Sequence, residues 1–452
     1  MASSPSSLVF KVQRCEPELV TPAKPTPHEF KYLSDIDDQE CLRFQLPMIQ
    51  VYRNEPEMRE KNPVKVIRKA LAEALVFYYP LAGRIREVHG RKLVVDCTGE
   101  GALFIEADAD VSLDQFSDAA LLPTFSCLKE LLYDVPGSSD IIGCPLLLIQ
   151  VTRLMCGGFI FALRLNHTLG DAAGLLQFMS TLGEMARGAQ SPSVPPVWKR
   201  ELLNARDPHP SGVTFLHREY DEVPDTKGTL SIPLDDMAHR PIFLGPSELA
   251  ALRKHLPFHL RKCTTFELLT ACLWRCRTIA IEPEPEEDTR VVVIVNARAK
   301  FRPPVPVGYY GNVLAFTTAI STAAELCQNP LSYALELVKK AKSEATEEFM
   351  RSQTNLLVMK GRPHLTAVRN IVVSDLTRAN FVDVDFGWGK AVYGGPAKTG
   401  VGIFPGVLGF YIAFRDHKGV DGIVVSISLP GPAMERFVTE IENMVKEPPV
   451  DG

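Results

Sequence analysis

The stretch LLLIQVTRLMCGGFIFALRLNHTLGDAAG, residues 146–174, determines the fold that we expect for this chain. Residues 146–152 and 158–165 are apolar runs joined by a Gly-Gly turn, which predicts two buried strands. The second run leads directly into NHTLGDAAG and then into residues 172–186, whose apolar side chains recur with helical spacing. A strand that passes directly into a helix can hold the side chains between them on rigid supports, in a cleft. We therefore expect a mixed α/β fold with candidate functional residues at this junction.

The rest of the chain mixes helical and extended patterns without a strict βαβ alternation. Helices are predicted by periodicity over residues 63–78, 247–255, 265–280, 331–349 and 432–446. Strands are predicted over residues 8–12, 44–52, 92–96, 101–107, 291–296, 384–389, 410–414 and 422–429.

Residues 189–212 are rich in Pro, Ser and charge, which is typical of a linker. The simplest organisation is an N-terminal α/β domain over residues 1–188, this linker, and a C-terminal α/β domain over residues 213–452.

The composition is that of an ordinary globular protein. The 452 residues are 46% hydrophobic and 23% charged, with a net charge of −5, which excludes a disordered chain and disfavours nucleic-acid binding. Ten dispersed cysteines lack a CxxC pair, and Cys272 and Cys276 have no neighbouring ligands that would complete a metal site. We expect reduced, mostly buried thiols. Without a leader or a membrane-spanning segment, we expect a cytoplasmic protein with no membrane partner.

His167 and Asp171 are the strongest chemical candidates, because they lie where the second strand meets the helix. An imidazole with a pKa near ~6.5 can accept the proton of an alcohol while the oxygen attacks an electrophile. The HxxxD spacing by itself is common in unrelated chains, so a core or surface histidine remains the alternative.

Other catalytic patterns are missing from the sequence. It contains no GxSxG, HExxH, GxGxxG or GxxxxGK[ST], the patterns of common esterases, zinc hydrolases and nucleotide-binding proteins. A lone general base without a covalent nucleophile suits an electrophile that is already activated, such as a thioester.

A second distinctive segment is DFGWG, residues 385–389. Glycines on either side of Trp388 predict a tight turn that presses the indole ring against its neighbours. A structural corner with a buried Trp and direct participation in catalysis are the two interpretations of this segment.

HTLGDAAG and DFGWG together resemble the two signatures of the BAHD acyl-CoA-dependent acyltransferases of plants. The resemblance covers the whole chain and includes YPLAGRIRE at 79–87, TTFELLTACLWRCR at 264–277 and RPPVPVGYYGN at 302–312. Residues 33–53, 91–111 and 429–437 look most like the alcohol acyltransferases of that family. The implied reaction is O-acylation of benzyl or another small primary alcohol by benzoyl-CoA or a short acyl-CoA.

The resemblance also implies a fold and roles for the signature residues. Two chloramphenicol-acetyltransferase-like domains of mixed sheet would enclose a channel, with His167 as the catalytic base at its centre. Asp171 would turn away from substrate to pair with Arg298, Gly387 and Trp388 would be structural, and Asp385 would be a second proton-handling residue.

The substrates and partners follow from the same resemblance. Thr264, Thr265, Ser374 and Asp375 would contact acyl-CoA, the co-substrate, and Arg378 aligns with a position that contacts the acceptor in some relatives. No metal and no permanently bound cofactor are implied, and we expect a monomer whose partners are small molecules. The alternatives are N-acylation of an amine, acylation of a larger phenylpropanoid alcohol, and a catalytically inactive acyl-CoA-binding relative.

Overall fold

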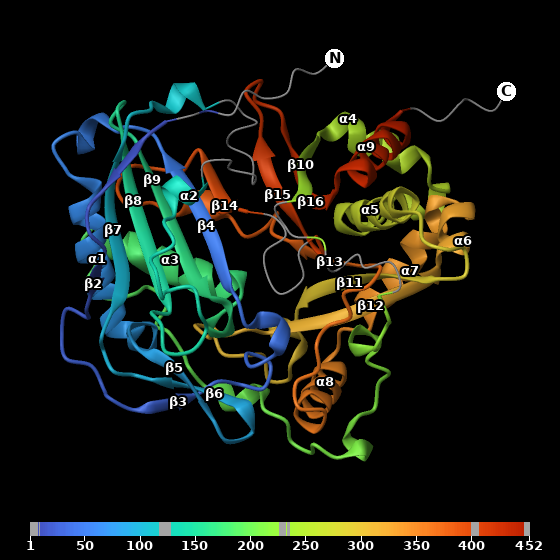
Figure 1. The fold of residues 1–452 in the computed structure, drawn as a ribbon, viewed down its shortest axis with the longest axis horizontal. Helices are drawn as coiled ribbons and strands as arrows, with labels where there is room; N and C mark the ends of the chain where they lie inside the picture. Colours follow the sequence, from blue (N-terminus) through green and yellow to red (C-terminus); the bar gives the residue numbers. More distant parts are fainter. Residues whose placement is uncertain are drawn as a thin grey trace.

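Two large mixed β-sheets dominate the structure, a computed structural model that describes residues 8, 10–116, 128–225, 232, 236–398 and 406–446. The first sheet has the order β1-β7-β8-β9-β4-β14, with β2 also paired to β7. Its strands are β1 (Val12–Arg14), β2 (Glu18–Val20), β4 (Gln45–Tyr52), β7 (Ala102–Ala109), β8 (Leu147–Leu154), β9 (Phe159–Asn166) and β14 (Tyr393–Pro396). Helices α1 (Pro63–Phe77) and α3 (Ala172–Ala186) pack against one another beside this sheet (Figure 1).

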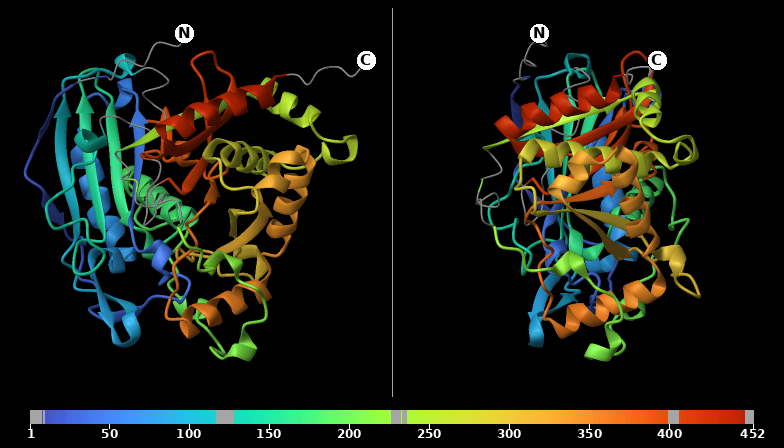
Figure 2. Two further views of the ribbon diagram at one scale, coloured as in Figure 1. Left: turned by 45° about the vertical axis from the view of Figure 1, so that its right-hand side comes forward. Right: turned by 90° about the vertical axis from the view of Figure 1, so that its right-hand side faces the viewer.

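The second sheet lies in the other half of the molecule, with the order β10-β16-β15-β13-β11-β12. Its strands are β10 (Met237–Leu244), β11 (Asp288–Asn296), β12 (Leu314–Thr322), β13 (Asn370–Asp375), β15 (Leu408–Arg415) and β16 (Asp421–Pro430). Figure 2 shows its helices along the outer side, away from the first sheet. The helices of this half are α4 (Pro246–Lys254), α5 (Thr265–Ile281), α6 (Ala323–Gln328), α7 (Leu331–Ser343), α8 (Glu347–Met359) and α9 (Gly431–Val445).

Smaller elements complete the first half. A three-stranded sheet pairs β6 (Lys92–Asp96) with both β3 (Phe30–Tyr32) and β5 (Arg84–Val88), and α2 (Leu128–Leu131) is a single turn. Within the described residues, no helix combines the length and apolar character that a membrane crossing requires.

The signature region folds as its sequence predicts. Strands β8 and β9 form an antiparallel pair, and α3 spans the predicted residues 172–186. The mixed α/β architecture is also confirmed, with the two large sheets drawn mainly from the two halves of the chain.

Three predicted elements are wrong. The strand predicted over 8–12 is displaced along the chain, because residues 8, 10 and 11 are not in a strand and β1 begins at Val12. The helix predicted over 331–349 is interrupted between α7 and α8, because the Thr346 side chain accepts a hydrogen bond from the Phe349 N–H and starts a new helix. Residues 384–389 do not form a strand, since Gly387 and Gly389 have φ angles of 108° and 76°, which a strand excludes. The tight turn predicted for DFGWG is confirmed.

The cysteines differ partly from the prediction. All nine described cysteines are free, but only four are buried, while Cys15 and Cys156 are exposed at the ends of strands. Cys127 lies outside the described residues.

One strand crosses from the second half of the chain to the first sheet. Strand β14 pairs with β4, in register from Tyr393 opposite Val51 to Pro396 opposite Met48 (Figure 1). Just before it, Phe386 and Trp388 pack into the core of the first half against Phe159. The division into residues 1–188 and 213–452 stays a prediction, with the amendment that residues 381–397 belong in space to the first half.

Candidate active site

His167 begins a single 3₁₀ turn, η7 (His167–Leu169), directly after β9. Its backbone N–H donates to the carbonyl of Phe44 at 2.9 Å, and its own carbonyl accepts from the Asn312 side chain at 2.9 Å. The imidazole packs against the Phe44 ring with 5.0 Å between ring centroids. These contacts fix the backbone and the ring of His167 from both halves of the chain.

The imidazole lines a cavity of about 70 Å³ between the two large sheets. Strand β4 contributes Leu46 and Met48 to its wall, while β13 of the second sheet contributes Ser374. The remaining lining is mainly apolar and consists of Phe44, Asp171, Ala172, Ile294, Leu314, Leu376, Phe381, Pro396, Leu408 and Phe410. The cavity therefore offers a hydrophobic environment with one imidazole exposed to it.

Burial keeps this imidazole neutral. Desolvation lowers the pKa of His167 below its usual value of 6.5, and this effect outweighs the opposing influence of Asp171 and Asn312. The Nδ1 atom is buried without a hydrogen-bond partner in the described part of the chain. A neutral imidazole that borders the cavity can accept a proton from a bound hydroxyl through its unprotonated ring nitrogen.

The carboxylate of Asp171 is fully engaged with protein groups. It caps α3 by accepting from the N–H groups of Ala173 and Gly174, and it accepts from the N–H of Val313 at 3.0 Å. Arg298 donates to both carboxylate oxygens, at 2.7 and 2.9 Å, so the predicted ion pair is confirmed. Burial alone would raise the pKa of Asp171, but the Arg298 charge and these hydrogen bonds hold it below its usual range.

A second buried ion pair, which the sequence analysis missed, supports the same turn. Arg200 Nη1 bonds to both oxygens of Asp37 at 2.8 and 2.9 Å, and its Nη2 donates to the carbonyl of Leu169 at 2.8 Å. Asp37 also accepts from the side chain of Asn312, the residue that bonds to the His167 carbonyl. Asp37 and Asn312 lie within segments that carry the family resemblance, but Arg200 lies in the predicted linker and no pattern marks it.

Two glycines of the signature allow a close backbone approach. A Cβ atom at Gly174 would lie 1.9 Å from the carbonyl oxygen of Tyr310, and one at Gly170 would lie 2.5 Å from it. Such distances leave no room for a side chain. The glycines therefore allow the start of α3 to lie against residues 309–313, which supply the contacts from Asn312 and Val313.

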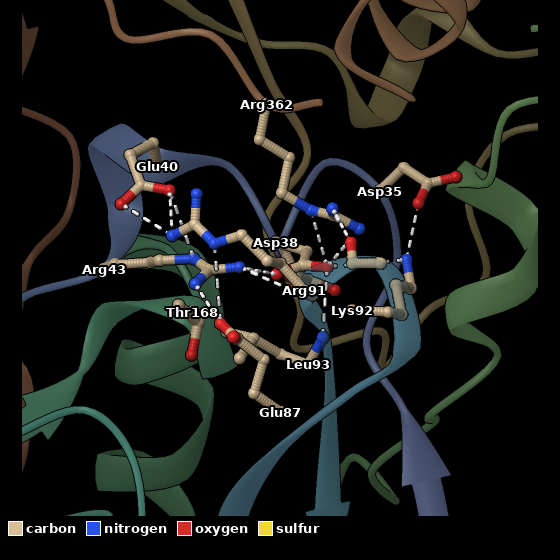
Figure 3. Close-up of polar contacts among 12 residues, drawn as sticks. Asp35, Asp38, Glu40, Arg43, Glu87, Arg91, Lys92, Leu93, Thr168 and Arg362 are labelled. Carbon is tan, nitrogen blue, oxygen red and sulfur yellow. Dashed lines mark hydrogen bonds and ion pairs between the residues drawn. The ribbon is translucent and has the colours of Figure 1, made fainter. Parts of the chain in front are cut away.

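A buried carboxylate near this turn joins the two halves of the chain (Figure 3). Asp38 is completely buried and accepts from Arg43 at 2.9 Å, from the Leu93 N–H at 3.1 Å and from Arg362 Nε at 2.9 Å. Burial raises the pKa of Asp38, although the cations of Arg362, Lys92 and Arg43 oppose that shift. Because Arg362 follows α8, this cluster ties the second half of the chain to the first.

The DFGWG turn is held mainly by hydrogen bonds within the segment. One carboxylate oxygen of Asp385 accepts from the N–H groups of Gly387 at 2.7 Å and Gly389 at 2.8 Å, and Arg187 donates to the Asp385 carbonyl. Trp388 is 4% exposed and meets the Phe159 ring edge-on. Among the described residues that line the His167 cavity, Asp385 does not occur. The geometry therefore favours the structural interpretation and gives the catalytic prediction for Asp385 no support.

The residues predicted to contact CoA divide between two cavities. Thr264, Thr265 and Asp375 line an outer cavity of about 390 Å³, together with Arg378, for which an acceptor contact was predicted instead. Ser374 instead lines the cavity of His167, because successive side chains of a strand point to opposite faces. The end of β13 thus lies between the outer cavity and the histidine.

This arrangement, a histidine after a strand and between two mixed sheets, is the one expected for a two-domain acyltransferase of the BAHD type. The sequence model of the Transferase family matches residues 10–444, and the chain belongs to this family, the BAHD acyltransferases. The predicted family and enzyme class are confirmed.

Individual relatives and solved structures match the chain over nearly its whole length. The chain is 66% identical to benzyl alcohol O-benzoyltransferases of Nicotiana tabacum (99% of this chain, 96% of the relative) and Petunia hybrida (98% and 95%). It is 54% identical to alcohol acyltransferase 16 of Actinidia chinensis var. chinensis, over 100% of this chain and 97% of that protein. Among solved structures, vinorine synthase matches with a TM-score of 0.73 at 20% identity, over 97% of this chain and 99% of that chain. The TRI101 complex of F. sporotrichioides with coenzyme A and T-2 matches with a TM-score of 0.65 at 18% identity, over 92% and 98%. These two structures show the same fold.

Proposed function

We propose that this protein transfers a benzoyl or short acyl group from acyl-CoA to the hydroxyl of benzyl alcohol or another small primary alcohol. The observation that carries the proposal is the neutral imidazole of His167 in an apolar cavity between the sheets. The names of the tobacco and petunia relatives supply the specific acyl group and acceptor.

The reaction proceeds by direct transfer. Nε2 of His167 takes the hydroxyl proton as the alcohol oxygen attacks the thioester carbonyl, which forms a tetrahedral oxyanion. The oxyanion collapses to the ester, and the departing CoA thiolate takes the proton back from the imidazolium. A simple thiol has a pKa of about 8.5, far below that of an alcohol, so the sulfur is the better leaving group.

The two cavities accommodate different parts of the acyl-CoA. The outer cavity, with Thr264, Thr265 and Arg378, receives the coenzyme. The thioester reaches past Ser374 to His167. The hydroxyl of Thr264 already accepts from the Glu267 N–H to cap α5, so it can contribute only its remaining hydrogen-bonding capacity. Arg378 has no assigned acceptor role in this proposal, because a small apolar alcohol presents no anionic group to it.

Asp171, Arg298, Gly387, Trp388 and Asp385 act structurally in this scheme. Asp171 and Arg298 position the turn that carries His167, and the DFGWG turn anchors the chain that leads into β14. Acyl-CoA is a co-substrate, and the reaction requires neither a metal nor a resident cofactor.

The lining of the cavity supports the proposal of small apolar acceptors. Phe44, Met48, Phe381 and Phe410 provide aromatic and aliphatic surface for a benzoyl or benzyl group. A polyol or a polyamine would bury several polar groups without partners there, at a cost of about 1–3 kcal/mol for each unsatisfied group.

A matrix of acyl-CoAs against alcohols and amines, with products identified by mass, tests this proposal. We expect benzyl benzoate or related small esters as the main products. Preferred acylation of an amine, of shikimate or quinate, or of a large phenylpropanoid alcohol would overturn the acceptor class. Absence of thiol release with every pair would instead indicate an inactive acyl-CoA-binding relative.

We further propose that the protein acts as a cytoplasmic monomer, as expected from the sequence. Light scattering on the purified protein measures its mass, for which 50.0 kDa is expected. A fluorescent fusion of the full chain should be diffuse in the cytosol, and import into an organelle would contradict this location.

A further inference from the structure

A pocket of about 240 Å³ lies at the opposite end of the second sheet from the outer cavity of the proposed CoA site. Ala367 and Arg369, which precede β13, and Gly406 and Val407, which precede β15, line it. The outer cavity instead meets β13 at its other end, Asp375. The two cavities are therefore separate sites at the two ends of the same strands.

Arg277, near the end of α5, lines this pocket and has no charged partner in the described part of the chain. Its exposed fraction is only 8%, and its Nε atom has no hydrogen-bond partner among the described residues. Burial lowers the pKa of this guanidinium to about 10, with no opposing contribution from a carboxylate. A buried cation without a counter-charge is costly in free energy, and an anion bound beside it would remove that cost.

The other arginines of the pocket are already paired. Arg369 forms an ion pair with Glu287 at 2.9 Å, and Arg436 forms one with Glu282 at 3.1 Å. Asp225 is the remaining acidic side chain among the described lining residues. Arg277 is therefore the one arginine of the pocket without an ion-pair partner among the described residues.

The start of α9 adds a second attraction for an anion. Pro432 and Ala433, in the first turn of this 15-residue helix, line the pocket. No side chain caps the N-terminus of α9. Because Pro430 and Pro432 lack an N–H, the first backbone N–H groups at this helix end belong to Gly431 and Ala433. Such a helix end carries a partial positive charge and favours anions.

The remaining walls decide which anion fits. They are mainly apolar and include Met237, Ile281, Val407 and Leu429. A doubly charged, strongly hydrated phosphate would lose its water against these walls, whereas a carboxylate with an apolar body would match both surfaces. The volume of about 240 Å³ is also below the ~300–1,000 Å³ of drug-sized ligand sites, which suits a small molecule.

We propose that this pocket is a binding site for a small organic carboxylate with an aromatic or short aliphatic body, held by Arg277 and the N-terminus of α9. The guanidinium pairs with the carboxylate, a geometry in which Arg can donate two parallel hydrogen bonds. The apolar body lies against Ile281 and Leu429.

Thermal unfolding with sodium benzoate as the probe tests this site, with sodium chloride and inorganic phosphate at equal ionic strength as comparisons. The melting temperature of the wild-type protein should rise saturably with benzoate, since a ligand that binds only the folded state stabilises it. The rise should be lost in Arg277→Met. It should persist in Arg275→Met, a matched change on the same helix at a side chain whose guanidinium donates instead to the Cys327 carbonyl.

The remaining outcomes distinguish the site from its alternatives. No benzoate effect on the wild type, or an effect that survives Arg277→Met because benzoate binds elsewhere, would overturn the proposal. A rise with phosphate but none with benzoate would overturn the carboxylate class.

The ligand-free variants provide an independent readout. Ligand-free Arg277→Met should melt at or above the wild-type temperature, because it removes an unpaired buried charge. A variant that folds but melts clearly below the wild type would count against the proposal. If Arg277→Met does not fold, Arg277→Lys should raise the half-saturating benzoate concentration at least tenfold, and an unchanged value would overturn the assignment.

Discussion

Asp171, four residues after the histidine of the candidate site, forms a bidentate ion pair with Arg298, which lies 127 residues further along the chain. The same carboxylate caps α3 and accepts from the backbone before β12. One side chain therefore fixes the start of α3 to the second half of the chain. The same contacts hold the preceding turn, which carries His167, in position.

Asp171→Ala should reduce stability as well as activity. It leaves Arg298 without its partner, and breaking a buried ion pair costs about 3–5 kcal/mol. The melting temperature and the yield of folded protein should fall, and Arg298→Ala should behave in the same way. The double variant should lose less than the sum of the two single losses. An Asp171→Ala protein that melts like the wild type yet is inactive would show that the carboxylate takes part in the chemistry.

His167→Ala should separate chemistry from stability. Loss of a positioned general base should lower turnover by about 10²–10⁴-fold or more. The melting temperature should change little, since the side chain borders a cavity. Activity is measured as thiol release, with His89→Ala, at an exposed position, as the control. Turnover within a few-fold of the wild type would exclude His167 as the base.

The pH dependence of kcat/KM should follow the protonation of His167. The neutral imidazole is the active form, so activity should be lost as pH falls and protonates the ring. Because burial lowers the pKa of His167, the midpoint of this loss should lie below 6.5. Circular dichroism at each pH confirms that the fold persists, and a midpoint above 6.5 would contradict the assigned environment.

Arg362→Ala should weaken the connection between the two halves of the chain. It removes one of the cations that neutralise the buried Asp38, and a hydrogen bond to a charged group contributes about 1.5–3 kcal/mol. Chemical denaturation measures the loss. Arg415→Ala breaks an equally short but exposed pair with Asp421 and should have little effect. Equal losses in the two variants would mean that burial does not strengthen the Asp38 contacts.

Gly174→Ala should disturb the site through packing alone. The added Cβ would meet the Tyr310 carbonyl at 1.9 Å, so the start of α3 must move and His167 with it. We expect a lower melting temperature and lower kcat. Gly431→Ala, at the first residue of α9 with open space around it, is the matched control and should be neutral. Unchanged kinetics in Gly174→Ala would show that the turn tolerates this movement.

The local pattern of apolar residues was enough to predict some helices and strands of this structure, but not the long-range contacts of the site. The helix over 172–186 and the strands before it follow from periodicity, because each lies within one apolar run. The ion pair of Asp171 with Arg298 was accessible only through the family resemblance, since nothing local connects the two residues. Arg200 lies in a segment with the composition of a linker, yet it is buried in an ion pair with Asp37. Because Asp37 is 163 residues away in sequence, no local periodicity could have predicted this contact. The break at Thr346 was missed because a capping side chain outweighed a continuous helical pattern.

Strand β14 comes from the second half of the chain but completes the first sheet, so folding of that sheet depends on residues near the end of the chain. Until residues 381–397 are in place, β4 remains an open edge strand with unpaired backbone groups, and the aromatic core beside it lacks Phe386 and Trp388. Exposed edges and apolar surface of this kind promote aggregation. During synthesis the first sheet therefore stays incomplete until nearly the whole polypeptide has emerged, and a fragment cut after residue 212 should self-associate rather than fold.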